Sequence, residues 1–320
     1  MANTIGANLD GKAISQRFFA AFLSRLAPVT SFATDFSREV LRGEKTVDVP
    51  LYTPKGSSDF TGSYDSSPDS EIDYRQVPID QHKFATINLS DIENAESQIE
   101  FEEFAEQAAK GLADDVFQDM LSPLTVVDYY YEIVSTSANF DSGAVIDAKA
   151  KADLVKMPRN QRTLLLGDAY YNALIKDPAI KNSKQYGSAE AIQAGTIRNL
   201  YGSTVRQASS IPDNSEYLEG MLVYPTALAL GMRYLQPQAP EVYTAIRALT
   251  DPKTGITIGL REWYEVTTGH RFMTFECQYG RAKGQEESCI RIVSTETLFS
   301  IDDEEGNSID DEAGFAVLYK

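Results

Sequence analysis

The amino-acid sequence predicts an α+β protein built from more than one packed part. A chain of 320 residues is long for one compact core. Residues 92–121 place apolar side chains at steps of three and four, which is typical of a long amphipathic helix. Residues 254–295 instead contain three short runs rich in strand-forming residues, separated by glycine-containing turns. Residues 122–253, between these two regions, alternate helical and strand patterns.

The composition is that of a soluble globular protein. Hydrophobic residues make up 42% of the chain, and no apolar run approaches the roughly 20 residues that a membrane span needs. The short apolar stretch 18–23 lies between Arg17 and Arg25 and lacks a small-residue cleavage site. It therefore predicts an amphipathic helix rather than a signal peptide. We expect a protein made in the cytoplasm, with no membrane partner.

The charge balance is strongly acidic, with 47 acidic and 29 basic residues and a net charge of -18. Such a surface repels free nucleic acid, whereas a protein that reads DNA presents a basic face. The balance is compatible with a protein that encloses DNA without gripping it. An excess of solubilising charge would explain it equally well.

The N-terminal region predicts an arm followed by helices. Residues 1–13 are small and polar and indicate a mobile arm. Over 16–26, Phe18 and Phe22 lie on one face of a predicted helix, which Pro28 ends. A second short helix is predicted over 31–41.

A polar segment between two strand-like runs is the least ordinary part of the chain. Residues 53–72 are rich in Ser, Asp, Gly and Pro and contain Phe60 and Tyr64. Alone, this composition indicates a flexible loop or linker. Because strand patterns over 45–52 and 74–89 bracket it, we predict a long ribbon whose tip projects into solvent. Loops of this length are commonly functional, and an arm that lies on a neighbouring subunit would be one such function.

The central helix of 92–121 would span roughly 40 Å, because a helix rises 1.5 Å per residue. Ser122-Pro123 ends it. Further helices are expected over 143–156 and 168–176, with strands over 163–167 and 203–208. A central strand over 221–224 is expected to lead into a helix over 225–235.

The strand-rich end of the chain and its tail complete the pattern. Strands are expected over 254–264, 271–277 and 288–293, with turns at Thr268-Gly269 and Gly280–Gly284. The segment 302–312 is acidic and is expected to be exposed.

A catalytic or metal site is not predicted. His82 and His270 lack the spacing of metal ligands and have no motif partner. No GxSxG or phosphate-binding GxxxxGK[ST] motif is present. Asp302–Ser308 lacks the alternating ligand pattern of a calcium loop. We therefore expect no catalytic residues, no cofactor and no metal.

The two cysteines, Cys277 and Cys289, have no CxxC context. Two thiols in a chain of this size indicate a reducing compartment and buried, inert side chains. A bridge between them is geometrically possible but is not the expectation.

The serial order of these features resembles a known family. The residues that carry the resemblance are Met157-Pro158 with Arg162-Thr163, Asp177-Pro178, Gly202–Val205, Gly220–Ala227, Gly255–Ile258 with Trp263-Tyr264, and Tyr279-Gly280. Together with the arm, the polar ribbon and the acidic helix, they resemble the major capsid protein of tailed bacteriophages, a fold shared with encapsulins. The resemblance covers roughly residues 14–295. The acidic end of the chain departs from it.

The resemblance implies a division of the chain. An N-terminal arm would cover 1–41 and an extended loop 53–76. A peripheral domain with a long spine helix would combine 42–52, 77–121 and 254–295. An axial domain would cover 122–253, and an acidic C-terminal extension 296–320. Contacts between subunits are expected at Phe18, Phe22, Phe60, Tyr64 and Tyr74.

The implied function is a structural subunit that assembles into hexamers and pentamers of an icosahedral capsid around double-stranded DNA, and not an enzyme. Scaffolding, portal and decoration proteins would be its partners. The virion would be its location, after synthesis in the host bacterial cytoplasm. Alternatives are an encapsulin-type compartment shell, a phage tail or adaptor protein, and an acidic α/β enzyme with an unrecognised carboxylate site.

Overall fold

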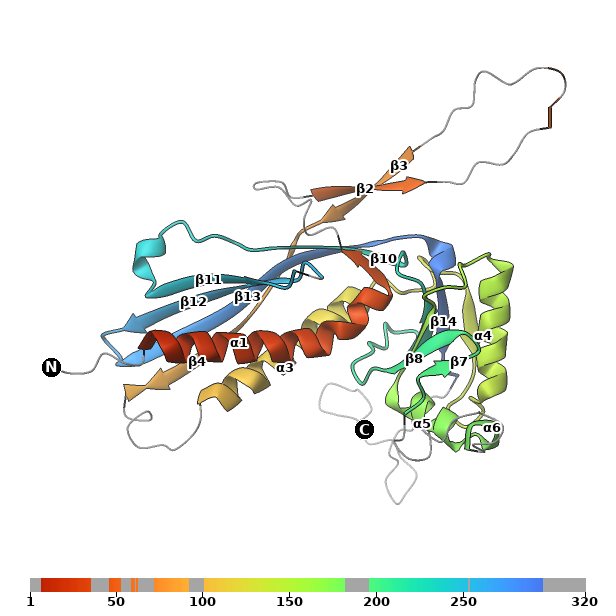
Figure 1. The fold of residues 1–320 in the computed structure, drawn as a ribbon, viewed down its shortest axis with the longest axis horizontal. Helices are drawn as coiled ribbons and strands as arrows, with labels where there is room; N and C mark the ends of the chain where they lie inside the picture. Colours follow the sequence, from red (N-terminus) through yellow and green to blue (C-terminus); the bar gives the residue numbers. More distant parts are fainter. Residues whose placement is uncertain are drawn as a thin grey trace, which may run out of the picture.

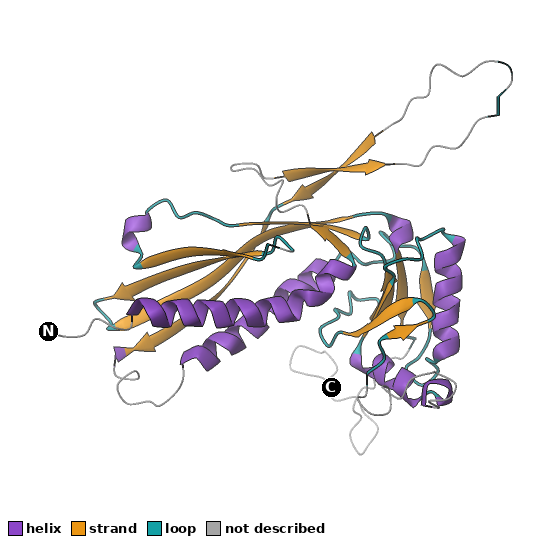
Figure 2. Cartoon of the chain, in the orientation of Figure 1, coloured by secondary structure: helices purple, strands orange, loops and turns teal. Residues whose placement is uncertain are grey.

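The computed structural model describes residues 7–35, 46–52, 59–60, 62, 72–91, 101–181, 196–252 and 254–295. These residues form two bodies, each built on a six-stranded sheet, and a separate two-stranded ribbon (Figures 1 and 2). The mixture of helices and strands is the α+β class that the sequence predicts.

The first sheet has the strand order β1-β10-β13-β12-β11, and β4 pairs with the other side of β13. Its strands are β1 (Ala33–Asp35), β4 (Gln81–Ser90), β10 (Leu228–Arg233), β11 (Ala245–Thr250), β12 (Thr257–Glu265) and β13 (His270–Lys283). The long strand β13 pairs with β12 along its first half and with β10 along its second half. Strand β13 is therefore the central strand that connects the other strands of this sheet.

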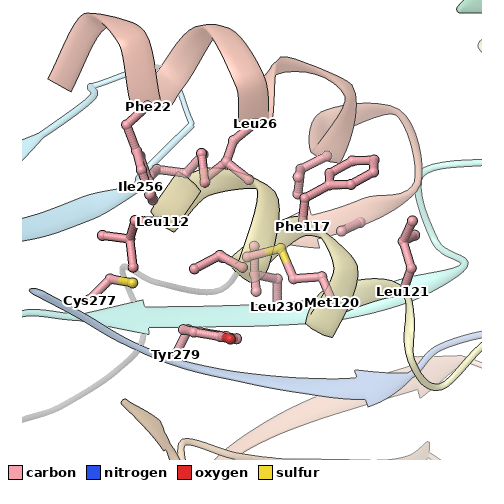
Figure 3. Packing of buried hydrophobic residues seen from close by; sticks show 14 of the residues in the cluster. Phe22, Leu26, Leu112, Phe117, Met120, Leu121, Leu230, Ile256, Cys277 and Tyr279 are labelled. Atoms are coloured by element: carbon pink, nitrogen blue, oxygen red, sulfur yellow. The ribbon is translucent and has the colours of Figure 1, made fainter. Parts of the chain in front are cut away.

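Two helices cover one face of the first sheet: α1 (Ala7–Leu26) and α3 (Phe101–Leu121). They lie side by side beneath β13 (Figure 1). Buried α3 residues recur at steps of three and four, at Ala105, Ala109, Leu112, Val116 and Met120, which is the spacing of one helix face. Figure 3 shows Leu112, Phe117 and Met120 between Leu26 of α1 and the strands that carry Leu230 and Tyr279.

The second sheet has the order β5-β14-β9-β6-β8-β7. Its strands are β5 (Glu132–Val134), β6 (Thr163–Leu166), β7 (Asn199–Leu200), β8 (Ser203–Gln207), β9 (Leu218–Val223) and β14 (Cys289–Val293). Side chains of α4 (Ser142–Leu154), α5 (Asp168–Lys176) and α6 (Pro178–Lys181) pack with one face of this sheet in a second core. The short 3₁₀ helices are η1 (Ala27–Ser31), η3 (Pro240–Val242) and η4 (Glu286–Ser288).

The two bodies share one hydrophobic core. The cluster beneath the first sheet continues through Leu121 and Leu124 to Leu165, Met221 and Val223 of the second sheet. The end of α3 is therefore buried against both sheets, and this shared packing joins the bodies without a flexible linker among the described residues.

Most predicted elements are confirmed, including the strands over 163–167 and 203–208, the helix over 143–156 and the helix over 168–176. The long helix is described from Phe101, and its predicted start at 92–100 lies outside the described residues. The predicted acidic extension 296–320 also lies outside them.

The N-terminal prediction is partly wrong. Helix α1 begins at Ala7, within the region 1–13 that the polar composition assigned to a mobile arm. The predicted helix over 31–41 is replaced by the end of η1 and by strand β1, which pairs in parallel with β10. Residues 36–45 lie outside the described part of the chain. Tertiary pairing overrides a weak local preference here.

The predicted helix over 225–235 is also wrong, because Leu228–Arg233 form strand β10. Five consecutive residues, Leu228 to Met232, are buried, since the strand lies between β1 and β13 in the sheet. A short run of consecutive apolar residues does not distinguish a central strand from a buried helix.

The sheet pairing corrects the predicted domain boundaries. Strands β10 and β11 fall within the predicted axial region 122–253, yet both belong to the first sheet. Strand β14 falls within the predicted peripheral segment 254–295, yet it pairs with β5 and β9 of the second sheet. The chain therefore passes between the two bodies more often than the predicted boundaries imply.

The predicted single run 74–89 is two strands. Strand β3 (Ile72–Pro78) pairs with β2 (Thr46–Tyr52), and Ile79-Asp80 separate it from β4. The predicted ribbon over 53–76 therefore has β2 and β3 at its base. These two strands lie outside both six-stranded sheets (Figure 1).

Candidate assembly surface

The base of the ribbon is anchored by a small apolar cluster. Val47 and Val49 of β2 and Val77 of β3 are buried together with Ile79 and with Ala229 of β10. In the sheet, Ala229 pairs with Ala282 of β13, whereas Leu230 and Tyr279 are in the core with the helices. Alternate residues of a strand face opposite sides. The ribbon is therefore fastened to the sheet face that α1 and α3 leave uncovered.

A glycine permits the ribbon to cross the sheet. The backbone of Pro78 and Ile79 lies directly on Gly280 of β13, and a Cβ atom at Gly280 would overlap the Pro78 carbonyl oxygen. Only a residue without a side chain allows two backbones to approach so closely. Gly280, which the sequence indicated as a turn glycine, therefore lies within β13 and sets the position of the ribbon.

The other side of the ribbon is exposed. Tyr74 of β3 is 61% exposed, and Gln76, which lies on the same face of the strand, is exposed too. Phe60, in the segment between the two strands, is 64% exposed. The structure thus leaves these two predicted contact residues at the surface. Tyr64, the third predicted contact of this segment, lies outside the described residues.

The prediction that Phe18 and Phe22 contact another subunit is wrong for this structure. Both side chains are fully buried within their own chain. The ring of Phe18 stacks on Phe275 of β13, and Phe22 joins the same core (Figure 3). An amphipathic pattern reveals that one helix face is covered, but not whether its own chain or a neighbour covers it.

Tyrosine hydroxyls hold α3 and the segment after it to the first sheet. Buried Tyr129 donates a hydrogen bond to the Ala227 carbonyl and accepts one from the Gly284 amide at 3.3 Å. Burial raises the pKa of Tyr129. Tyr279 donates to Asp119 at 2.7 Å, and Arg281 donates to the same carboxylate oxygen at 2.8 Å. The hydroxyls thus lie where α3 meets β10 and β13.

A buried arginine holds the second sheet to the segment after α3. Arg291 of β14 is 1% exposed and donates to Glu216 at 2.5 Å. The same carboxylate accepts the backbone amide of Val126 at 2.9 Å. A buried charge is tolerated only when it is paired and hydrogen-bonded. These bonds therefore fix β14 of the second sheet against the segment that follows α3.

The Met157–Arg162 stretch has a structural role in the loop before β6. Arg162 is 3% exposed and donates to the carbonyls of Met157 and Pro158 at 2.5 and 2.9 Å. It also pairs with Asp153 at the end of α4 at 2.8 Å, and its hydrogen bond lowers the pKa of that carboxyl. The Arg162 side chain therefore fixes the loop, and this structural role accounts for the Met157–Arg162 stretch without a catalytic one.

The Asp177-Pro178 pair likewise joins helices. The Asp177 carboxylate accepts the backbone amides of Ser142 and Ala179 at 2.7 and 2.8 Å. Burial alone would raise the pKa of Asp177, but these hydrogen bonds outweigh it and the pKa is lowered. The residue therefore ties the start of α4 to the start of α6.

The described residues contain no group of three or more His, Cys, Asp or Glu that could hold a metal ion. His82 lies 3.1 Å from the buried carboxylate of Glu276, and His270 bonds to the Thr268 carbonyl. Cys277 and Cys289 are free and buried, and burial raises the pKa of each thiol to about 12. Within the part of the chain described, no helix is long and apolar enough to cross a membrane.

The arrangement therefore defines a two-body α+β protein whose ribbon is fastened to a sheet face that α1 and α3 do not cover. No protein-family model matches the chain, and no curated protein matches its sequence. Solved structures do match its fold. The capsid structure of the cyanophage P-SCSP1u gives a TM-score of 0.60 at 12% identity, over 83% of this chain and 87% of that one.

Two further solved structures also match the fold over most of both chains at low sequence identity. The mature capsid of bacteriophage PhiM1 gives a TM-score of 0.58 at 9% identity, over 84% of this chain and 87% of that one. A virus-like particle from Pyrococcus furiosus gives 0.52 at 9% identity, over 88% and 98%. The chain thus has the phage major-capsid fold that the resemblance predicted.

Proposed function

We propose that this protein is a structural, non-enzymatic subunit that assembles into hexamers and pentamers of an icosahedral capsid around double-stranded DNA. The observation that supports this most directly is the β2–β3 ribbon. A two-stranded ribbon is marginally stable alone, and among its described residues those at its base are buried against the body of the chain whereas Tyr74 and Phe60 are exposed. A neighbouring copy that covers Tyr74 and Phe60 would supply the missing burial.

The charge and the shared core fit the same role. A net charge of -18 keeps the free subunit soluble and avoids adhesion to packaged DNA. The core shared by the two bodies gives a subunit that keeps its shape while its surfaces make repeated contacts. Contacts between different surfaces of neighbouring copies close into rings, and many weak contacts add together in a lattice.

In this proposal the protein is located in the virion capsid, after synthesis in the bacterial cytoplasm. Scaffolding and portal proteins, and a decoration protein, are its partners. The similarity to the virus-like particle from P. furiosus favours a second candidate, an encapsulin-type compartment shell that assembles without a phage scaffold.

The test is assembly of the purified full chain, alone and with a scaffolding protein, followed by negative-stain microscopy and sedimentation velocity. Shells or rings are expected. Shells formed by the chain alone around protein cargo would favour the second candidate. A monomer under every condition would contradict both.

A pair of ribbon variants tests the role of Tyr74. Tyr74→Asp places a charge on the exposed face of β3 and should abolish assembly while thermal unfolding of the monomer stays unchanged. Tyr74→Phe keeps the ring and is the matched control, which should assemble. If Tyr74→Asp assembles like the wild type, the ribbon does not carry the contact.

A further inference from the structure

The outward face of α4 carries an apolar stripe. Ile146 is 46% exposed and Leu154 is 79% exposed, and Ala150 is exposed between them. Residues four apart lie above one another on a helix, so the three side chains form one row. In Figure 1, α4 lies at the outer edge of its body, with no described element on its far side.

Basic residues outnumber acidic ones in the segment that carries this stripe. The segment 142–162 has five basic and two acidic residues, a net charge of +3, in a chain whose net charge is -18. Its buried Arg162 serves the loop, as described above. The others lie nearer the surface. Arg159 is 82% exposed and Lys149 is half-buried, and both pair with Asp153, at 3.5 and 3.8 Å. Lys156 is exposed, and Lys151 is exposed and donates to the Glu132 carbonyl.

The C-terminal segment of the same chain has the complementary composition. Residues 296–320 contain eight acidic residues and one basic residue, Lys320, a net charge of -7. They also contain apolar residues such as Leu298, Phe299 and Phe315. A segment that is both acidic and apolar suits a surface that is both basic and apolar.

The point where the described chain ends puts this segment within reach. Strand β14 ends at Val293, and its Ile290 and Ile292 share a core with Val145 and Ala148 of α4. Helix α4 has 13 residues and is about 20 Å long. Asp302 follows Val293 by nine residues, and nine residues of extended chain span about 30 Å, which is more than the length of α4.

We propose that the stripe of Ile146, Ala150 and Leu154, with the basic residues near it, binds the acidic C-terminal segment 296–320 of the same chain. The short connection gives this segment a high local concentration at α4, which favours the chain's own tail over that of another copy. Individual exposed ion pairs are weak and are screened by salt, so the docking loosens as ionic strength rises. The inference does not rest on the shell function.

Lysine reactivity in the full chain tests the contact. Neutralising the acidic run with Asp302→Asn, Asp303→Asn, Glu304→Gln and Glu305→Gln should raise the rate at which Lys156 reacts with an amine reagent. A roughly five-fold rise is expected if the tail covers Lys156 about four-fifths of the time, because only the undocked fraction reacts. Lys110 of α3, which pairs with Glu106 at 2.8 Å, is the internal reference and should not change. Equal Lys156 rates in both proteins would overturn the proposal.

Zero-length cross-linking tests whether the tail docks on its own chain. A carbodiimide should join Lys156 to an acidic residue of 302–312 in a mixture of ¹⁴N- and ¹⁵N-labelled chains. Cross-links within one isotope support the proposal. Cross-links that join both isotopes equally, or none to α4, would overturn it.

Discussion

Phe18 of α1 stacks on Phe275 of β13, with ring centroids 3.6 Å apart and ring planes 5° apart. This contact fastens the N-terminal helix to the centre of the first sheet. The role of Phe18 is therefore the stability of its own chain.

Phe18→Ala should lower the free energy of unfolding by about 3–5 kcal/mol, because it leaves a cavity in a fully buried site. Denaturant unfolding of the unassembled chain measures this. Phe104→Ala, at a side chain that is 54% exposed on α3, is the control and should change stability by less than about 0.5 kcal/mol. A Phe18 variant as stable as the control would show that α1 is not held by this contact.

Gly280→Ala should displace the ribbon, because the new methyl group would overlap the Pro78 carbonyl. The expected cost is about 1–3 kcal/mol of stability, as for overpacked sites, together with faster hydrogen exchange in β3. Gly111→Ala on α3 meets nothing within 4 Å and should stabilise the helix by about 0.5–1 kcal/mol. Unchanged exchange in β3 of the Gly280 variant would contradict the proposed crossing.

Asp177 should make the chain sensitive to acid. Its pKa in the folded chain lies below the ordinary value, which is about 3.9 in unfolded chains. The stabilisation is therefore fully present above that ordinary value, and it is lost as the pH falls through the lower folded pKa.

Asp177→Ala should cost about 1–2 kcal/mol at neutral pH, because it leaves two backbone amides without their acceptor. The same variant should flatten the acid limb of a plot of unfolding free energy against pH. Asp147→Ala, at an exposed position of α4, removes one carboxyl as the control and should change stability at neutral pH by less than about 0.5 kcal/mol. An acid limb that is identical in the Asp177 variant would contradict this role.

The thiols of Cys277 and Cys289 should be inert while the chain is folded. Burial raises both pKa values to about 12, so at pH 8 only about one thiol in ten thousand is ionised. A thiol reagent should modify neither residue in the native chain and both in urea. Rapid native labelling of one cysteine would show that its site opens.

The sequence alone determined the class of fold and most of its local elements. The spacing of apolar residues predicted α3, and the strand-like runs predicted β2 and β6, because these patterns depend on neighbours along the chain. The strand-like runs on either side of 53–72 predicted the ribbon for the same reason. The order of these features was sufficient for the capsid-fold resemblance.

Only the tertiary structure decided which surfaces each element meets. The burial of Phe18 within its own chain, the strand conformation of Leu228–Met232 and the transfer of β14 to the second sheet all depend on partners far away in the sequence. The crossing of Pro78 over Gly280 is of the same kind. The local sequence pattern indicates that one face of an element is buried. Long-range packing decides which other element covers that face.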